Sequence, residues 1–354
     1  MTPRAVDMGS VRRILIIKLS AFGDIIHALP VAAALRESFP HVELTWLVDE
    51  PYTALVSGNP FLSHIMALPK ARGRQLRSLA YHRAYFRRIN DVRKQQFDLT
   101  LDLQGLTKSA MVARASGAKT RLAYHWLREA AFLFERAVPR RPQSVHIVDQ
   151  YLDVARFLGA NVEHPQFAFH IPHEDEAAAE ALLAEHGVDR ETSFVTINPA
   201  SALAIKQWSA AKFGALIDLL YSHLGLRSVV VTADRAVAAE VAACVSAPFA
   251  NLAGRTNLKQ LGAVIRRSAL HICGDTGSGH LAAALSRPVI ALVGPTDADR
   301  ICPYGQRDHV IQHRERCGAA CDWHHCQYAV PQCMEAISLQ EVAAQIEQMR
   351  LCRS

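Results

Sequence analysis

An aspartate follows the first apolar segment of the chain at short distance. Residues 14–30 read ILIIKLSAFGDIIHALP, so an apolar run ends at Lys18, a short turn with Ser20 follows, and a helical pattern opens at Asp24. A carboxylate at the carboxyl end of a strand can accept a proton from a substrate hydroxyl. Aspartate is also a favoured N-cap residue, so capping of the helix is the competing interpretation of Asp24.

A second segment combines glycines with polar side chains. Residues 270–296 read LHICGDTGSGHLAAALSRPVIALVGPT, which predicts a strand, a glycine-rich turn, a helix and a further strand. Glycines let the backbone approach a ligand, and the amides at the helix start favour an anion. The spacing matches neither the phosphate loop of ATPases nor the dinucleotide fingerprint. A diphosphate or sugar hydroxyls held by Asp275, Thr276 and the amides fit better. His280 lies one turn into the helix, where a structural hydrogen bond is as good an interpretation as ligand contact.

A third segment, INPASALAIKQW, starts at the end of another expected strand. Ser201 and Lys206 lie in its loop and could hold a phosphate. A single lysine in a loop is more often merely solvated, so this segment alone does not decide the matter.

Alternating strands and helices must position these residues. The expected strands are rich in Val, Ile and Leu, as in parallel sheets covered on both faces. They are Ile14–Ile17, Glu43–Val48, Phe97–Leu103, Ser193–Asn198, Arg227–Thr232, Ala269–Cys273 and Pro288–Val293. The expected helices are Asp24–Phe39, Ala210–Leu224, Arg235–Ser246, Leu258–Arg267 and Ser338–Arg350, the last with Ser338 as N-cap. This alternation predicts an α/β fold, and a proline-containing stretch at Asn161–Asp175 predicts a linker between two doubly wound domains. Ligands are expected at the carboxyl ends of the strands, in a cleft that the domains face.

The composition excludes several classes of protein. The chain has 354 residues, of which 50% are hydrophobic and 20% charged, so it is neither disordered nor collagen-like. No apolar stretch reaches the 18 residues or so of a membrane span. Lys18 interrupts the first apolar run too early for a signal peptide, and we expect a cytoplasmic protein.

The three segments together resemble glycosyltransferase family 9, the bacterial ADP-heptose heptosyltransferases of lipopolysaccharide synthesis. The resemblance rests on KLSAFGDIIHALP, the lysine of the middle loop, and GDTGSGHLAAAL with GPT, in this order. WLVDE at 46–50, DLQGLTKS at 102–109 and Arg128–Glu129 look most like heptosyltransferase I, which adds the first heptose to Kdo on lipid A.

The resemblance implies a GT-B fold whose domains have separate functions. Residues 1–165 would bind the acceptor, residues 166–337 the nucleotide sugar, and residues 338–354 would form a C-terminal helix. No cofactor is implied for catalysis. The partners would be an ADP-sugar, an anionic lipopolysaccharide-core acceptor and, peripherally, the inner membrane. No nucleic-acid motif is present.

The resemblance also implies roles for single residues. Asp24 would be the general base of one inverting displacement, and Lys206 would offset charge on the leaving diphosphate. The acceptor pocket would contain Lys18, Ser20 and Arg128, and the donor site would contain Ser201, Asp275, Thr276, Gly277 and His280. Two departures concern the donor: Ala202 follows Ser201 where the family often has a second hydroxyl residue, and the acid that contacts ribose could be Asp234 or Glu240.

Positive charge gathers in one segment of the first domain. Between Lys70 and Lys94 there are nine Lys or Arg residues against one acid, Asp91, within a net charge of +6 for the chain. An anionic acceptor or an anionic membrane surface would be attracted there. A solvated helix face is the plainer interpretation.

Four of the eight cysteines gather near the end of the chain. They form the pattern C-x3-C-x4-C-x6-C at Cys317, Cys321, Cys326 and Cys333. Four thiolates can close a tetrahedral zinc or iron site, with His324 or His325 as substitutes. Similar cysteine-rich segments occur in some family relatives, including iron-binding ones. Free thiols are the equal alternative.

Three other functions compete with the heptosyltransferase hypothesis. A family 9 enzyme could instead glycosylate a protein or another core sugar. A nucleotide-sugar epimerase would share the fold, and a non-catalytic module could bind anionic glycolipid through the basic segment alone.

Overall fold

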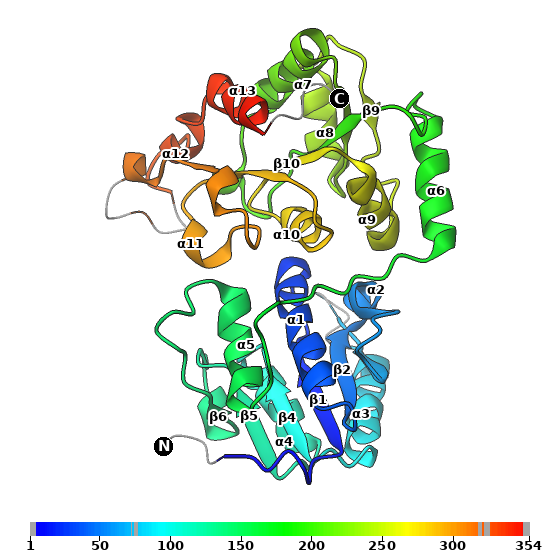
Figure 1. Ribbon diagram of the computed structural model, residues 1–354, viewed down its shortest axis with the longest axis vertical. Helices are drawn as coiled ribbons and strands as arrows, with labels where there is room; N and C mark the ends of the chain where they lie inside the picture. Colours follow the sequence, from blue (N-terminus) through cyan, green and yellow to red (C-terminus); the bar gives the residue numbers. More distant parts are fainter. Residues whose placement is uncertain (1–4, 72, 74–76, 318–320, 322–325, 350–354) are drawn as a thin grey trace. The chain divides into compact units, whose positions relative to one another are not determined.

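The chain forms two compact units, residues 1–170 and 171–354. The structure is a computed structural model, and it describes residues 5–71, 73, 77–317, 321 and 326–349 (Figure 1). Each unit is a parallel α/β domain with one six-stranded sheet. The expected fold class is therefore confirmed at the level of each domain.

The sheet of unit 1 has the strand order β3-β2-β1-β4-β5-β6, and all its pairs are parallel. The strands are β1 (Arg13–Ile17), β2 (Glu43–Asp49), β3 (His64–Leu68), β4 (Leu99–Asp102), β5 (Thr120–Ala123) and β6 (Arg136–Ala137). The helices are α1 (Phe22–Ser38), α2 (Thr53–Val56), α3 (Leu79–Lys94), α4 (Thr107–Ala115) and α5 (Ile147–Phe157). The strand order reverses between β1 and β4, which is where doubly wound sheets bind ligands.

Unit 2 repeats this topology in the order β9-β8-β7-β10-β11-β12. Its strands are β7 (Phe194–Asn198), β8 (Arg227–Val230), β9 (Ala250–Asn251), β10 (Leu270–Gly274), β11 (Val289–Val293) and β12 (Val310–Gln312). Its helices are α6 (His173–Ala184), α7 (Ala210–Leu224), α8 (Arg235–Ala242), α9 (Leu258–Arg267), α10 (Gly277–Ala284), α11 (Ala298–Ile301), α12 (Gln332–Glu335) and α13 (Leu339–Gln348). Here the order reverses between β7 and β10.

The expected elements exist, and their ends differ in informative places. Helices α7 and α9 have the predicted bounds, and Ser338 caps α13 through its side chain. Helix α8 ends four residues before the predicted Ser246, and α6 begins at His173, inside the predicted linker. Strands β3, β5, β6, β9 and β12 were not predicted from the sequence, and they lie at or near the edges of the sheets. Edge strands are less apolar than central ones because one side is not covered, so they give a weaker pattern.

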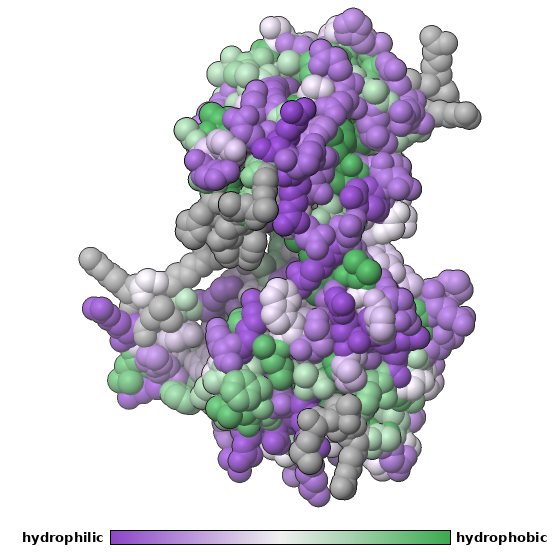
Figure 2. Space-filling view, turned by 90° about the vertical axis from the view of Figure 1, so that its left-hand side faces the viewer, coloured by the Kyte–Doolittle hydropathy of each residue, from purple (hydrophilic) through white to green (hydrophobic). Residues whose placement is uncertain are grey.

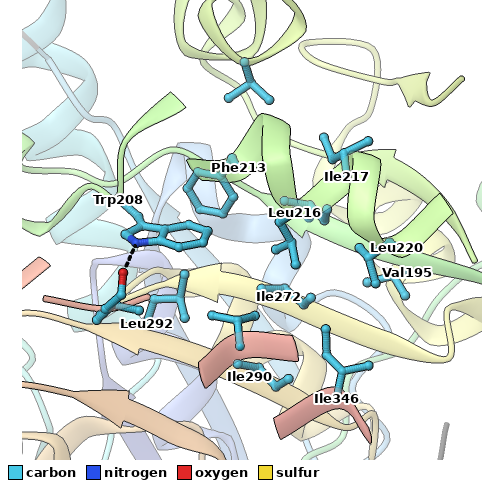
Figure 3. Close-up of a cluster of buried hydrophobic side chains, with 14 of the residues drawn as sticks. Val195, Trp208, Phe213, Leu216, Ile217, Leu220, Ile272, Ile290, Leu292 and Ile346 are labelled. Atoms are coloured by element: carbon cyan, nitrogen blue, oxygen red, sulfur yellow. Dashed lines mark hydrogen bonds between the residues drawn. The ribbon is translucent and has the colours of Figure 1, made fainter. Parts of the chain in front are cut away.

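A large apolar core fixes the sheet of unit 2 to its helices. Side chains from β7, β10 and β11 meet α7 and α13 in this cluster (Figure 3). The indole Nε1 of Trp208 donates a hydrogen bond of 3.0 Å to the carbonyl of Ile337, which satisfies the one polar atom of this buried ring. On the face shown in Figure 2, hydrophilic residues are mixed with small hydrophobic patches. None of the described helices combines the length and apolar character that a membrane span requires.

Candidate active site

Asp24 lies in the first turn of α1, directly after the carboxyl end of β1. The helix begins at Phe22 with Ala21 in the N-cap position, so Asp24 is not the N-cap residue, but its side chain does contribute to capping by accepting from the Ala21 amide. Asp24 is the third helical residue, and its Oδ2 lies 3.5 Å from the amide nitrogen of Ala21. The side chain is 48% exposed, which leaves the carboxylate accessible to a ligand.

Lys18 is buried behind Asp24. Its Nζ donates hydrogen bonds to the carbonyl of Leu103 at 3.0 Å and to the hydroxyl of Tyr151 at 2.8 Å, and it lies 3.7 Å from Oδ2 of Asp24. The side chain of Lys18 is only 2% exposed. A buried ammonium needs such partners because desolvation is otherwise costly. Lys18 therefore faces Asp24 from inside the protein.

The turn between β1 and α1 is held by residues from two neighbouring strands. Oε1 of Gln104, just after β4, accepts hydrogen bonds from the amides of Leu19 and Ser20, both at 3.1 Å. Nε1 of Trp46 on β2 donates to the carbonyl of Lys18 at 3.2 Å. WLVDE and DLQGLTKS thus position the turn that carries Ser20 and precedes Asp24.

The same two segments also hold cations at this edge of unit 1. Asp49, 3% exposed at the end of β2, pairs with Lys70 at 3.1 Å and with Lys108 at 3.4 Å. Arg128 is exposed, with its Nη2 donating to the carbonyl of Gln104 at 3.3 Å and its guanidinium 5.6 Å from the Trp126 ring. Positive groups therefore line the edge where Asp24 lies.

A second lysine and aspartate meet in unit 2, after β7 and β10. Nζ of Lys206 donates to Oδ2 of Asp275 at 2.7 Å, and Oγ1 of Thr296 donates to the same oxygen at 2.7 Å. The side chains of Lys206 and Asp275 are 11% and 10% exposed. Thr296 belongs to the GPT sequence after β11, and its role in holding Asp275 was not foreseen.

The loop that carries Lys206 is fixed to the core. Lys206 ends a short 3-10 helix, and Trp208 follows two residues later in the apolar cluster of unit 2. Ser201 lies earlier in this loop, and its Oγ is buried without a hydrogen-bond partner among the described residues. An unpaired hydroxyl there can receive a ligand oxygen.

A network of hydrogen bonds between buried polar side chains supports the glycine-rich turn. His271 on β10 meets Thr196 Oγ1 through Nδ1 at 2.9 Å and Ser278 Oγ through Nε2 at 3.0 Å. Ser278 also lies 2.9 Å from Thr276 Oγ1 and accepts from Nδ2 of Asn198 at 2.8 Å. Burial lowers the pKa of His271 to about 3, so the imidazole stays neutral, with one nitrogen accepting and the other donating.

The start of α10 adjoins this network through Thr276 and Ser278. Thr276 is the N-cap residue and Gly277 the first helical residue, so the first amides of the helix are not used within it. His280 lies one turn in, as predicted, and a small pocket is lined by His280 together with Asp275 and Thr276. Gly279 has a packing role instead, since a Cβ there would lie 2.7 Å from Sγ of Cys273.

The two candidates for a ribose-binding acid lie on or next to α8. Asp234 is the N-cap of that helix, and its Oδ1 accepts hydrogen bonds from the amides of Ala236 at 3.0 Å and Val237 at 3.2 Å. Glu240 lies exposed in the last turns of α8. The carboxylate of Asp234 is thus partly engaged by the backbone.

The four clustered cysteines have unequal surroundings. Cys317 and Cys333 are buried in the core of unit 2, whereas Cys321 and Cys326 are partly exposed. Burial and then the neighbouring Cys317 thiol raise the pKa of Cys333 to about 12, and the same two causes raise the pKa of Cys321. His324 and His325 lie outside the described residues. Within the part of the chain that is described, no three His, Cys, Asp or Glu side chains are arranged to hold a metal ion, so the predicted metal site is not shown.

The supporting residues were harder to foresee than the exposed ones. Gln104, Tyr151 and His271 act on candidate site residues from positions far away in the chain. A histidine inside an otherwise apolar strand, as in LHICG, was an available signal for His271. Nothing in the helical segment around Tyr151 marks its contact with Lys18.

Comparison with known proteins shows the family. The model of glycosyltransferase family 9 (heptosyltransferase) matches residues 85–328, which include Lys206 and Asp275 and leave out Asp24. The lipopolysaccharide core heptosyltransferase OpsX of Haemophilus influenzae is 27% identical, covering 84% of this chain and 83% of the relative.

Two further relatives give a similar picture. Lipopolysaccharide heptosyltransferase 1 of Salmonella typhimurium is 28% identical, covering 83% of this chain and 92% of that protein. The structure of Escherichia coli heptosyltransferase WaaC with ADP-2-deoxy-2-fluoro heptose superposes with a TM-score of 0.73 at 22% identity, covering 95% of this chain and 99% of the other. The fold is therefore GT-B. With the family model matching more than half of its length, the chain belongs to glycosyltransferase family 9 and is a glycosyltransferase.

Proposed function

We propose that this glycosyltransferase moves a heptose from ADP-heptose to Kdo of the lipopolysaccharide inner core, at the cytoplasmic face of the inner membrane. The curated relatives named above act, by their names, on lipopolysaccharide, and the E. coli structure was solved with an ADP-heptose analogue. Residues 1–165 would bind the acceptor, residues 166–337 the donor, and residues 338–354 would add the C-terminal helix. The segments WLVDE and DLQGLTKS favour the type that adds the first heptose.

The pairing of Asp24 with buried Lys18 carries the proposal. Asp24 combines a half-exposed carboxylate with a place at the topological switch point of unit 1. In the proposed step, Asp24 takes the proton of an acceptor hydroxyl while that oxygen bonds to the anomeric carbon of the heptose. The bond from this carbon to the diphosphate breaks, and ADP leaves with the electron pair. A single displacement of this kind inverts the anomeric centre.

Lys18 and the polar residues around it would support this base. The ammonium of Lys18, fixed by Tyr151 and the Leu103 carbonyl, would place a positive charge beside the carboxylate of Asp24. Ser20 and Arg128 would meet the acceptor, whose carboxylate and phosphate groups suit the cations of this edge.

The donor side would be built from unit 2. Lys206 and the first amides of α10 would face the negative charge that develops on the departing diphosphate, and they could stabilise it without a divalent cation. Ser201 and Thr276 would contact phosphate oxygens, with His280 beside them. Both hydrogen bonds to Asp275 end on Oδ2, so Oδ1 can accept a hydroxyl of the heptose.

Product analysis tests this function directly. Purified protein is incubated with ADP-heptose and Kdo-lipid A, and the products are separated and their anomeric linkage determined by NMR. We expect one heptose per acceptor with inverted anomeric configuration, and ADP in equal amount. Transfer to a peptide or to a later core sugar in place of Kdo would overturn the acceptor assignment. A changed sugar nucleotide without any acceptor would indicate an epimerase.

We also retain a structural zinc or iron at the cysteine cluster as a proposal. It is supported by the spacing of the four cysteines and by the nearness of the Cys317 thiol to Cys321 and Cys333, whose pKa values it helps to raise. Elemental analysis of the purified chain tests it: about one equivalent of metal is expected, and the Cys317→Ser variant should lose it. Stoichiometric titration of all these thiols in metal-free, folded protein would show that they are simply free.

A further inference from the structure

Helix α3 is an unusually exposed element of unit 1. Of its sixteen residues, only Val92 is buried, and Tyr81, Tyr85, Ile89 and Asp91 are half-buried. A helix that packs through so narrow a stripe leaves most of its circumference to solvent.

Large apolar side chains lie on the outer face of α3. Leu79 is 63% exposed and Phe86 is 67% exposed. They are seven residues apart, or about two turns, so they lie on the same face of the helix. On the neighbouring helix α4, Met111 is 57% exposed. Two large apolar side chains that are mostly exposed and aligned in this way suit burial against an external surface.

The residues between and around these apolar side chains are cationic. Arg83 is one turn from Leu79, and Arg87 is next to Phe86, so both share the outer half of the helix. In the part of the chain that the structure describes, neither arginine forms an ion pair, whereas Arg88 and Lys94 both approach Asp91 at 3.8 Å. The two outer arginines are therefore available to an external anion.

We propose that the outer face of α3, formed by Leu79, Arg83, Phe86 and Arg87, docks on an anionic membrane surface. The helix would lie parallel to the membrane, with Leu79 and Phe86 inserted among the acyl chains and the arginines at the phosphate level. A negatively charged lipid surface matches both parts of the face, the positive charge and the apolar side chains. A soluble acidic protein would match the charge alone.

The position of α3 gives membrane docking a use in bringing the acceptor to the site. The helix follows β3 and leads to β4, so its first turn is on the side of unit 1 where the strands end and Asp24 lies. A lipid-anchored acceptor would then reach the site from the surface on which α3 rests. This use rests on the proposed function, whereas the docking itself can be measured without donor or acceptor.

Vesicle flotation tests the proposal with the full chain. Vesicles of phosphatidylethanolamine with phosphatidylglycerol are expected to carry the wild-type protein, and vesicles of phosphatidylcholine alone are not. Added salt should weaken the binding, since exposed charges are screened. The Arg83→Gln/Arg87→Gln variant should bind roughly 25-fold more weakly, at about fivefold per charge. The Leu79→Ser/Phe86→Ser variant should bind at least tenfold more weakly.

Matched controls come from unit 2. Arg190→Gln/Arg255→Gln changes the net charge equally at two exposed arginines, each paired with a glutamate. Tyr221→Ser/Val330→Ser removes exposed apolar side chains elsewhere, which are 45% and 54% exposed. Both controls should bind vesicles like the wild type, and circular dichroism should show all variants folded.

Several results would overturn the docking. One is wild-type binding that does not depend on phosphatidylglycerol; another is equal loss of binding in the control variants. Sedimentation that shows α3 variants dissociating an oligomer, with vesicle binding intact, would assign the face to a second copy of the chain. A chain that transfers heptose to a soluble acceptor and binds no vesicles would refute the docking while leaving the proposed function in place.

Discussion

Each unit places a lysine beside an aspartate at its topological switch point, and the two pairs differ in distance and exposure. In unit 1, Lys18 is buried and Asp24 is 48% exposed, with 3.7 Å between Nζ and Oδ2. In unit 2, Lys206 and Asp275 are both about 10% exposed and 2.7 Å apart, and Thr296 donates to the same oxygen.

This difference indicates that the two lysine–aspartate pairs have different functions. A loosely held, accessible carboxylate can take up a proton from a ligand. A carboxylate that already accepts two short hydrogen bonds is better suited to orient a ligand and the lysine beside it. We therefore expect Asp24 to act in proton transfer and Asp275 in donor placement, and four measurements can break or sharpen this distinction.

The largest effect is expected from neutralising the two aspartates. Asp24→Asn should lower kcat by roughly 10²–10⁴-fold, because proton removal from the acceptor is lost, while the Kd for ADP stays unchanged. Asp275→Asn should act mainly on the KM for the donor. Steady-state kinetics and calorimetry with ADP measure both. The distinction fails if Asp24→Asn turns over at near the wild-type rate, or if Asp275→Asn lowers only kcat.

A slightly smaller effect is expected at Lys206. Lys206→Met should lower kcat by about 10²–10³-fold, because a positive charge near the leaving diphosphate is removed. Lys206→Arg keeps the charge and should retain part of the rate. The half-buried Lys212, at the start of α7, offers a control: Lys212→Met removes a charge of the same unit and should leave kcat within twofold of the wild type. Equal rates for Lys206→Met and Lys212→Met would remove Lys206 from the mechanism.

A moderate effect is expected at Tyr151, which acts on Asp24 only through Lys18. Tyr151→Phe deletes the hydroxyl that accepts from Lys18 at 2.8 Å, so the ammonium loses one of its partners. We expect unfolding to become easier by roughly 1.5–3 kcal/mol, typical of a hydrogen bond to a charged group. The folded variant should also have a lower kcat, with the Kd for ADP unchanged, since the cation beside Asp24 is less well fixed. An unchanged kcat with lowered stability would mean that Tyr151 is purely structural.

The smallest effect on catalysis is expected at a carboxyl pair without a lysine, Asp102 and Glu135, whose influence is on stability. Burial, followed by the charge of Asp102, raises the pKa of Glu135 from 4.5 to about 11. The folded protein therefore keeps a proton that the unfolded chain loses above about pH 4.5, and the free energy of unfolding falls as the pH rises through this window. Glu135→Gln should match the wild type near pH 4 and exceed it in stability near pH 9.

Urea unfolding at both pH values measures this difference. The exposed Glu163 gives the control, because Glu163→Gln should follow the wild type at each pH. A wild-type stability that does not fall between pH 5 and pH 9 would contradict the retention of a proton on Glu135.

The local pattern of the sequence determined much of the molecule. Central strands such as β7 and β10 are near-continuous apolar runs, and helices α7 and α9 have clear caps, so their ranges could be predicted closely. The candidate residues that follow these strands, Asp275 above all, could be found because strand ends mark the ligand edge of a parallel sheet.

Only the tertiary structure decided how those residues are held. Whether Asp24 only caps its helix or also stays accessible to a ligand depends on the exposure of its carboxylate, which the sequence pattern does not resolve. The partners of Lys18 come from Leu103 and Tyr151, 85 and 133 residues away, and chemistry at such separations follows from strand order. Local propensity acts over a few residues, whereas burial and long-range hydrogen bonding assign the protonation and orientation of a side chain. The residues proposed to carry the chemistry could therefore be identified from the sequence. The groups that hold and orient them could not.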